Sequence, residues 1–333
     1  MRTRSPGRRL LAGFAAAVAL LAGVSAAGAQ GSPAGFPMSA VKLVVTTGAG
    51  SGPDVIARIV ADFLSRAWGQ QVFVVNHPGA AVALGMKVAG SATPDGYTLL
   101  YAQSSSFVAL PEIQSSFPYD LLRDFVPIGF IGEQPMALAV SPKLGVDTLG
   151  QFIALAKSKP GSINIAVLSR GGIPHLTAEW LKLATATEMT AVNYSGAPQA
   201  LSDVMGGNLQ AIFDGLPSLA GNITGGSIKL MAIGSQMRLP NFPDVPTAAE
   251  TVPGFKALGF FAIMAPPGTP APITGKISAD LAKVLADPEL IAKFHAIATY
   301  PRPMTPAEMV TYVHHEQQLW KPVIEKIGMK AAK

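Results

Sequence analysis

The sequence predicts an α/β fold of two lobes, in which each lobe is a mainly parallel sheet flanked by helices. The chain has 333 residues, more than one average domain, and 49% are hydrophobic while only 14% are charged, as is typical of compact folded proteins. A β-branched run at 42–46 leads through a glycine-rich loop into a helical pattern, and this order restarts at 163–168. We therefore expect one lobe at 30–137 plus 262–333 and a second at 138–261.

The first loop has the features of an anion-binding turn at the start of a helix. Apolar residues recur at helical spacing from Ile56 to Ala67, and Pro53 suits the first helical position. Glycine-rich turns at helix N-termini present backbone N–H groups to an anion. The candidate ligand-binding residues of this loop are Gly48, Ala49, Gly50, Ser51 and Asp54. A tight turn without a ligand is an equally good interpretation of this stretch alone.

Nucleotide-binding motifs do not fit this loop. A P-loop ends in Gly-Lys-Ser/Thr, where this chain has Gly52, Pro53 and Asp54. A Rossmann fingerprint needs a third glycine where Pro53 stands. Because the carboxylate of Asp54 would repel a phosphate, we expect a less charged ligand group, a carboxylate.

Two further strands of the first lobe, at 72–75 and 97–102, also end in polar loops. The candidates there are Asn76, Gly79, Ala80, Ser104 and Ser105. Since the carboxyl ends of parallel strands meet at one sheet edge, we expect these loops to lie beside the first loop. Ordinary turn residues and exposed loop serines are the alternatives. Separate strands are expected at 125–131 and 136–141.

The second lobe is expected to supply an opposing set of loops. Its strands at 163–168, 190–193 and 209–213 are followed by the candidates Ser169, Arg170, Gly171, Gly172, His175, Tyr194 and Asp214. A solvated arginine, a structural histidine at a helix start, a core tyrosine and a strand-end acid remain as alternatives. His175 lies four residues before Glu179, but HExxH is absent and no third ligand is evident, so no metal site is expected.

The N-terminus is a predicted secretory leader over residues 1–29. Four arginines precede an apolar run at 10–24, and Ala27-Gly28-Ala29 is a small-x-small cleavage site. Cleavage after Ala29 would deliver the chain to the bacterial periplasm; an uncleaved anchor is the alternative. Removing the four leader arginines from the formal charge of +5 leaves about +1, so no nucleic-acid partner is expected. The chain has no cysteine, which excludes disulfides and thiol catalysis.

An ordered set of motifs across about residues 40–325 resembles the receptors of tripartite tricarboxylate transporters, the TctC or Bug family. They include Asn76-x-Pro78-Gly79-Ala80, the run from Pro94 to Leu100, His175-Leu176-x-x-Glu179, Phe213-Asp214 and the run from Pro243 to Thr247. The resemblance implies a type II, Venus flytrap periplasmic binding protein that is not an enzyme and needs no cofactor. It also implies a carboxylate held by backbone N–H groups, hydroxyls and water, transporter membrane components as partners, and a monomer.

Two other functions stay open at the level of sequence. A secreted α/β hydrolase would use the same cleft, but it needs an activated nucleophile, and no nucleophile elbow or paired-carboxylate signature is present. A carboxylate-sensing receptor for a signalling partner would share the site and differ only in its partner. The sequence leaves the ligand open among mono-, di- and tricarboxylates and aromatic acids.

Overall fold

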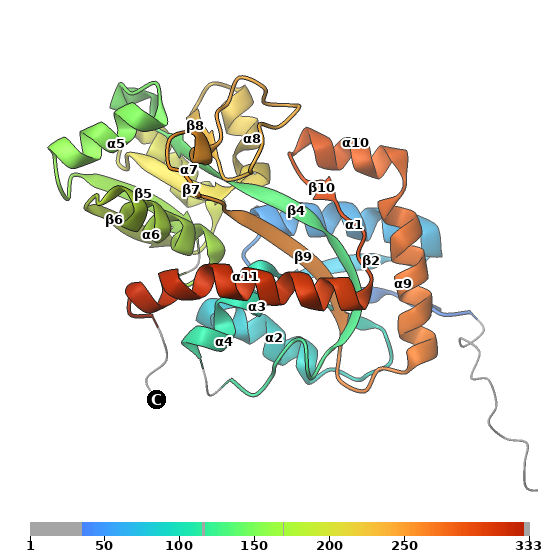
Figure 1. Ribbon diagram of the computed structural model, residues 1–333. Helices are drawn as coiled ribbons and strands as arrows, with labels where there is room; N and C mark the ends of the chain where they lie inside the picture. Colours follow the sequence, from blue (N-terminus) through green and yellow to red (C-terminus); the bar gives the residue numbers. More distant parts are fainter. Residues whose placement is uncertain (1–34, 115–116, 169, 330–333) are drawn as a thin grey trace, which may run out of the picture. The chain divides into compact units, whose positions relative to one another are not determined.

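A ten-stranded sheet runs through the chain from Pro37 onward (Figure 1). The computed structural model describes residues 35–114, 117–168 and 170–329, so the predicted leader lies outside the described residues. The strands are β1 (Val41–Val45), β2 (Val72–Asn76), β3 (Thr98–Gln103), β4 (Val126–Val140), β5 (Ile163–Leu168), β6 (Met189–Tyr194), β7 (Ala211–Gly215), β8 (Lys229–Ile233), β9 (Leu258–Ala265) and β10 (Tyr300–Pro301). Their order is β2-β1-β3-β9-β4-β7-β5-β6, and both β8 and β10 pair with β4.

Parallel strands lie at both ends of this order. At one end β1 pairs with β2 and β3, and at the other β5 pairs with β6 and β7. The antiparallel strands β9 and β4 join the two groups. The predicted α/β class is confirmed. The predicted lobe boundaries at 137/138 and 261/262 fall inside β4 and β9, and the division into lobes stays a prediction.

β4 is one strand of 15 residues, whereas the sequence predicted two strands at 125–131 and 136–141. That prediction was wrong because Glu133, Gln134 and Pro135 interrupt the apolar pattern without interrupting the pairing. β9 pairs with all three of these residues. The register of this pairing shifts only nearer the start of β4. The last residues of β4, from Met136, pair with β7 and β8. One strand therefore runs through both groups.

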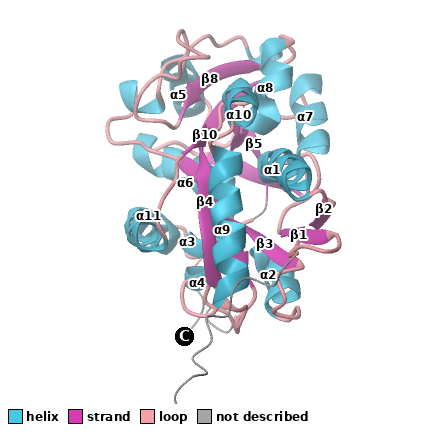
Figure 2. Ribbon diagram, turned by 90° about the vertical axis from the view of Figure 1, so that its right-hand side faces the viewer, coloured by secondary structure: helices cyan, strands magenta, loops and turns pink. Residues whose placement is uncertain are grey.

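Helices follow the parallel strands and cover the sheet (Figure 2). They are α1 (Gly52–Trp68), α2 (Ala83–Gly90), α3 (Ser104–Val108), α4 (Leu110–Ile113), α5 (Leu149–Ser158), α6 (Ile173–Thr185), α7 (Ala197–Gly206), α8 (Leu216–Thr224), α9 (Ala271–Leu285), α10 (Pro288–Ala296) and α11 (Pro306–Lys326), with short 3-10 turns at Ala80–Val82, Pro142–Leu144 and Ala248–Glu250. The predicted unit of β1, glycine-rich loop and α1 is confirmed, with Ser51 at the N-cap. None of the described helices is both long and apolar enough to cross a bilayer.

The serines at 104–106 form the first turn of α3 and are buried. The sequence placed them in a loop, because a run of three serines favours a turn over a helix. Packing overrides this preference, since α3 contacts β3, β9 and α11. These serines, which follow β3 directly, are therefore held at the edge of the sheet by packing.

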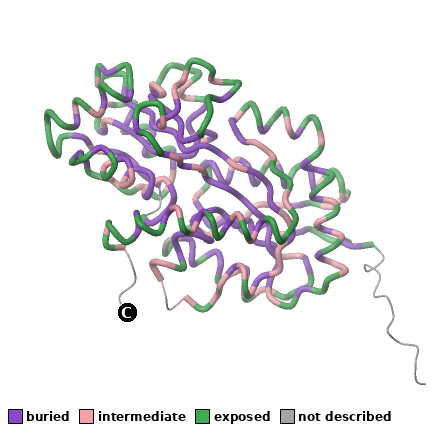
Figure 3. The backbone as a smooth tube through the Cα atoms, viewed as in Figure 1, coloured by how far each residue is buried: buried purple, intermediate pink, exposed green. Residues whose placement is uncertain are grey.

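The C-terminal helix α11 packs across both parts of the sheet. It contacts α3, β4 and α6, and its inner face is buried while its outer face is exposed (Figure 3). Trp320 of α11 packs edge-on against Trp180 of α6 with ring centroids 5.2 Å apart. Beside it the fully buried carboxylate of Glu316 pairs with Lys256 at 3.0 Å. A charge buried under α11 is therefore neutralised by one partly exposed lysine.

Replacing Lys256 by Met is expected to lower the free energy of unfolding by about 3 kcal/mol, because it leaves a buried carboxylate without its cation. The double variant Lys256→Met/Glu316→Leu should recover most of this loss, since it removes the charge as well. Urea unfolding of both variants tests this. The control is Lys293→Met, which breaks an exposed pair with Glu289 and should cost at most about 0.5 kcal/mol. Equal effects of the two lysine variants would contradict the prediction.

Candidate ligand-binding site

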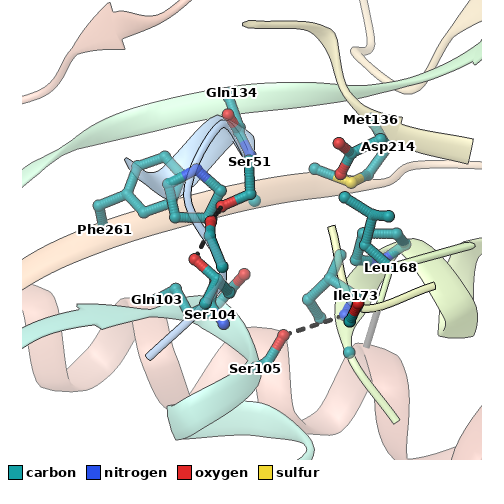
Figure 4. A pocket seen from close by; sticks show the side chains of 17 residues that line it. Ser51, Gln103, Ser104, Ser105, Gln134, Met136, Leu168, Ile173, Asp214 and Phe261 are labelled. Atoms are coloured by element: carbon teal, nitrogen blue, oxygen red, sulfur yellow. Dashed lines mark hydrogen bonds between the residues drawn. The ribbon is translucent and has the colours of Figure 1, made fainter. Parts of the chain in front are cut away.

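A small cavity lies where the loops after β1, β5 and β6, the junction of β3 with α3 and the end of β7 meet the strands β4 and β9 (Figure 4). Its volume is about 30 Å³, room for about two waters. The lining residues are Thr47, Gly48, Ser51, Pro53, Gln103, Ser104, Ser105, Gln134, Met136, Leu168, Gly172, Ile173, Pro174, Ser195, Asp214, Gly259 and Phe261. Lysine, arginine and histidine are absent from this described lining, so its donors are neutral.

Two helices from opposite ends of the sheet begin at the cavity. α1 starts behind the N-cap Ser51 and α6 behind the N-cap Gly172, and both N-cap residues line the cavity. Neither N-cap makes a side-chain hydrogen bond to the first turn of its helix. The positive ends of both helix dipoles therefore favour an anionic oxygen at this position.

The two sets of loops touch each other around the cavity. The N–H group of Ile173, at the start of α6, donates a hydrogen bond of 3.0 Å to Oγ of Ser105 in α3. The carbonyl oxygen of Ser195 lies so close to Gly48 that a Cβ at this position would be 2.8 Å from it. Only glycine allows this approach. The loops before α1 and α6 therefore share one cavity.

Asp54 stabilises the first loop, although its side chain does not line the cavity. Its carboxylate accepts hydrogen bonds from Gly50 N–H (2.9 Å), Arg58 Nε (3.0 Å) and Asn76 Nδ2 (2.9 Å). Asn76 Nδ2 also donates to the carbonyl oxygen of Thr47 at 2.9 Å. Burial acts to raise the pKa of Asp54, but these hydrogen bonds and the charge of Arg58 outweigh burial and keep the pKa below its usual value. Asp54 and Asn76 thus set the shape of the loop that lines the cavity.

Asp214 is a buried carboxyl group at the cavity wall, with 2% of its surface exposed. It lies just before α8, and its carboxylate accepts hydrogen bonds from the hydroxyl of Ser218 and from Gly215 N–H. Burial raises the pKa of Asp214 to about 6, although these two hydrogen bonds oppose the rise. Near neutral pH this carboxyl group is therefore ionised at a cost in stability.

The structure brings six predicted site residues to the cavity: Gly48, Ser51, Ser104, Ser105, Gly172 and Asp214. Four others line a second, more open cavity of about 750 Å³, which shares Ser195 with the first: Gly79, Ala80, Arg170 and Tyr194. Six line neither of these two cavities: Ala49, Gly50, Asp54, Asn76, Gly171 and His175. Ser169 lies outside the described residues.

The predicted residues away from the first cavity have identifiable partners. His175 Nδ1 accepts a hydrogen bond of 3.2 Å from Gly171 N–H, so this histidine holds the turn before α6. The hydroxyl of Tyr194 donates to Asp203 Oδ2 at 2.6 Å. These contacts are consistent with structural roles, Tyr194 also lines the second cavity, and ligand binding by either residue stays a prediction.

Sequence reasoning missed the residues that the crossing strands contribute, namely Gln134, Met136, Gly259 and Phe261. A signal existed for Gln134, because it is a polar residue inside an apolar segment. Phe261 has no such signal, since an aromatic residue in a strand is ordinary core. The other missed residues, such as Thr47 and Ser195, flank the loops that were predicted.

The stability of the wild type should fall relative to Asp214→Asn as the pH rises from about 4 to 7. Well below pH 3.8 the Asp214 carboxyl is protonated in both folded and unfolded chains. Above that pH the unfolded chain loses the proton first, because its pKa is near 3.8 and the folded value is about 6. Unfolding is thus favoured by about 3 kcal/mol at neutral pH. Denaturant titrations of both proteins at each pH measure the difference, and parallel pH profiles would refute this assignment.

Comparison with known proteins identifies relatives of this chain. Residues 56–329 match the tripartite tricarboxylate transporter family receptor. Protein BugT of Bordetella pertussis is 33% identical over 297 residues, covering 89% of this chain and 91% of BugT. The structure of R. palustris Rpa4515 with adipate is 28% identical with a TM-score of 0.85, covering 89% of this chain and 100% of that one. MatC (Rpa3494) from Rhodopseudomonas palustris with bound malate is 26% identical with a TM-score of 0.80, covering 87% and 100%.

The family match includes the crossing strands β4 and β9 and every other strand except β1, which lies before residue 56. The resemblance seen in the sequence motifs is therefore confirmed. The chain belongs to the family of tripartite tricarboxylate transporter receptors.

Proposed function

We propose that this chain is a periplasmic receptor that captures a small carboxylate between two lobes and delivers it to the membrane components of a tripartite tricarboxylate transporter. Family membership supports this proposal, as do the adipate and malate in the two related structures. The observation that carries it is the convergence of α1 and α6, from opposite ends of the sheet, on one buried cavity lined by neutral donors.

Capture would rest on hydrogen bonds from the backbone and from hydroxyl groups. The cavity is lined by Gly48 and Gly172, which carry backbone N–H groups just before α1 and α6, and by the hydroxyl-bearing Ser51 and Ser104. Hydrogen bonds to a carboxylate are stronger than those between neutral groups. A neutral donor set also leaves no buried cation to be neutralised when the ligand is absent.

Binding would also close the two lobes. The ligand would contact loops from both groups of parallel strands, and β4 and β9 would bend as the hinge. The hydrogen bond between Ile173 and Ser105 and the approach of Ser195 to Gly48 are contacts suited to the closed form. The leader would direct the chain to the periplasm, where we expect it to act as a monomer that binds its solute without chemical change.

Titration calorimetry against mono-, di- and tricarboxylates, including aromatic acids, is the central test. We expect at least one acid to bind, and its affinity to fall only mildly between low and high salt, because the donors are neutral. A steep salt dependence would contradict the neutral donor set. Failure of every acid to bind would contradict the receptor function, and conversion of a carboxylate ester or amide in the same cell would favour a hydrolase.

Replacing Asp54 by Ala should weaken binding of that acid by at least about tenfold, although Asp54 does not line the cavity. The loss of its hydrogen bonds to Gly50 and Asn76 frees the loop that presents the backbone donors, and preorganisation is lost. The matched control is Asp62→Ala on the same helix, which removes an exposed ion pair with Arg66 and should leave affinity unchanged. Equal affinities of the two variants would refute the positioning role.

A further inference from the structure

Gln134 is a buried amide at the cavity that packing alone does not explain. Only 3% of its surface is exposed, and its Oε1 atom has no hydrogen-bond partner among the described residues. Figure 4 shows its side chain at the cavity, above the start of α1. A buried acceptor without a partner costs about 1–3 kcal/mol. Gln134 Oε1 is therefore an acceptor that a donor group of a ligand in the cavity could satisfy.

Three glycines from distant parts of the chain make room for this side chain. A Cβ on Gly52 would lie 2.9 Å from Gln134 Oε1, one on Gly259 would lie 3.1 Å from its Cγ, and one on Gly215 would overlap its amide. None of the three has the left-handed backbone conformation that requires glycine. Their small size accommodates the amide, so the chain provides a slot for Gln134 between α1, the end of β7 and β9.

Asp214 adds a second acceptor to the same cavity. An ionised carboxylate only accepts hydrogen bonds, and the described lining of the cavity contains no basic side chain to pair with it. Its neighbour Gly215 is one of the three glycines around Gln134. The cavity therefore has two kinds of wall: one carries hydrogen-bond donors near the starts of α1 and α6, and the other carries the unpaired acceptor of Gln134 beside Asp214, whose carboxylate accepts from Ser218 and Gly215 and has no cation in the described lining.

We infer that the ligand is a carboxylate that also carries a hydrogen-bond donor, a hydroxyl or an ammonium group, and that Gln134 and Asp214 accept from this group. This inference rests on the proposed receptor function and specifies its ligand class. The carboxylate would occupy the donor wall. A plain carboxylate would leave Gln134 Oε1 unpaired and Asp214 without a further donor, whereas a hydroxy or amino acid can supply one, and such sites reject analogues that lack the donor.

The test compares acids that differ only in the substituent next to the carboxylate. The sets are propionate, lactate and alanine; succinate, malate and aspartate; glutarate, 2-hydroxyglutarate and glutamate; and phenylacetate, mandelate and phenylglycine. In calorimetry with the wild type we expect a substituted member of one set to bind at least about tenfold tighter than its plain member. In Gln134→Met, which keeps the length of the side chain and removes the amide, this ratio should fall toward one.

The exposed Gln71, just before β2, provides the matched control, and Gln71→Met should keep the wild-type ratio. Asp214→Asn should lower the affinity for an ammonium member more than for a hydroxyl member, which identifies the donor.

Plain acids that bind as tightly as substituted ones would overturn this inference and leave the receptor function intact. An unchanged ratio in Gln134→Met would overturn the role of Gln134. Failure of all members to bind would overturn the receptor function and this inference with it. The wild-type ratio needs no variant, so the test stands even if Gln134→Met does not fold.

Discussion

The passage of β4 through both groups of parallel strands is the constraint on which the site depends. Its first part pairs with β9 and its last residues pair with β7 and β8. The parallel strands on either side end in loops that lead into helices, and these loops meet at the middle of the crossing strands. Helix N-termini from two separate groups of strands are thereby placed around one small volume, which neither group encloses alone.

The chemistry of that volume follows from how the loops are held. Gly48 allows the first loop to approach the backbone of Ser195, and Asp54 ties the same loop to Gly50, Arg58 and Asn76. The charges of Asp54 and Arg58 therefore lie behind the loop and pair with each other. The cavity itself keeps neutral donors, which stabilise an anion without a buried cation.

The acceptor groups in the cavity are available to a ligand at a cost in folding stability. Gln134 leaves an acceptor unpaired, and burial raises the pKa of Asp214 to about 6. Each lowers the stability of the unliganded chain. The surrounding core offsets this cost, since the strands beside the cavity are buried along most of their length and α11 packs across both groups. Such local costs in a well-packed fold are typical of binding sites.

The sequence by itself determined the α/β class and the glycine-rich loops before α1 and α6, because these depend on local patterns of glycine, proline and apolar spacing, and an ordered set of motifs carried the resemblance to the family. Only the tertiary structure decided which side of each loop faces the cavity. Asp54 and Asn76 lie behind the first loop, the serines after β3 are helical, and β4 is one strand. Gln134 reaches the site through contacts with Gly52 and Gly215, each some 80 residues away along the chain. Contacts between such distant segments leave no periodic pattern in a sequence. They depend on how the strands cross in three dimensions, and not on neighbouring residues along the chain.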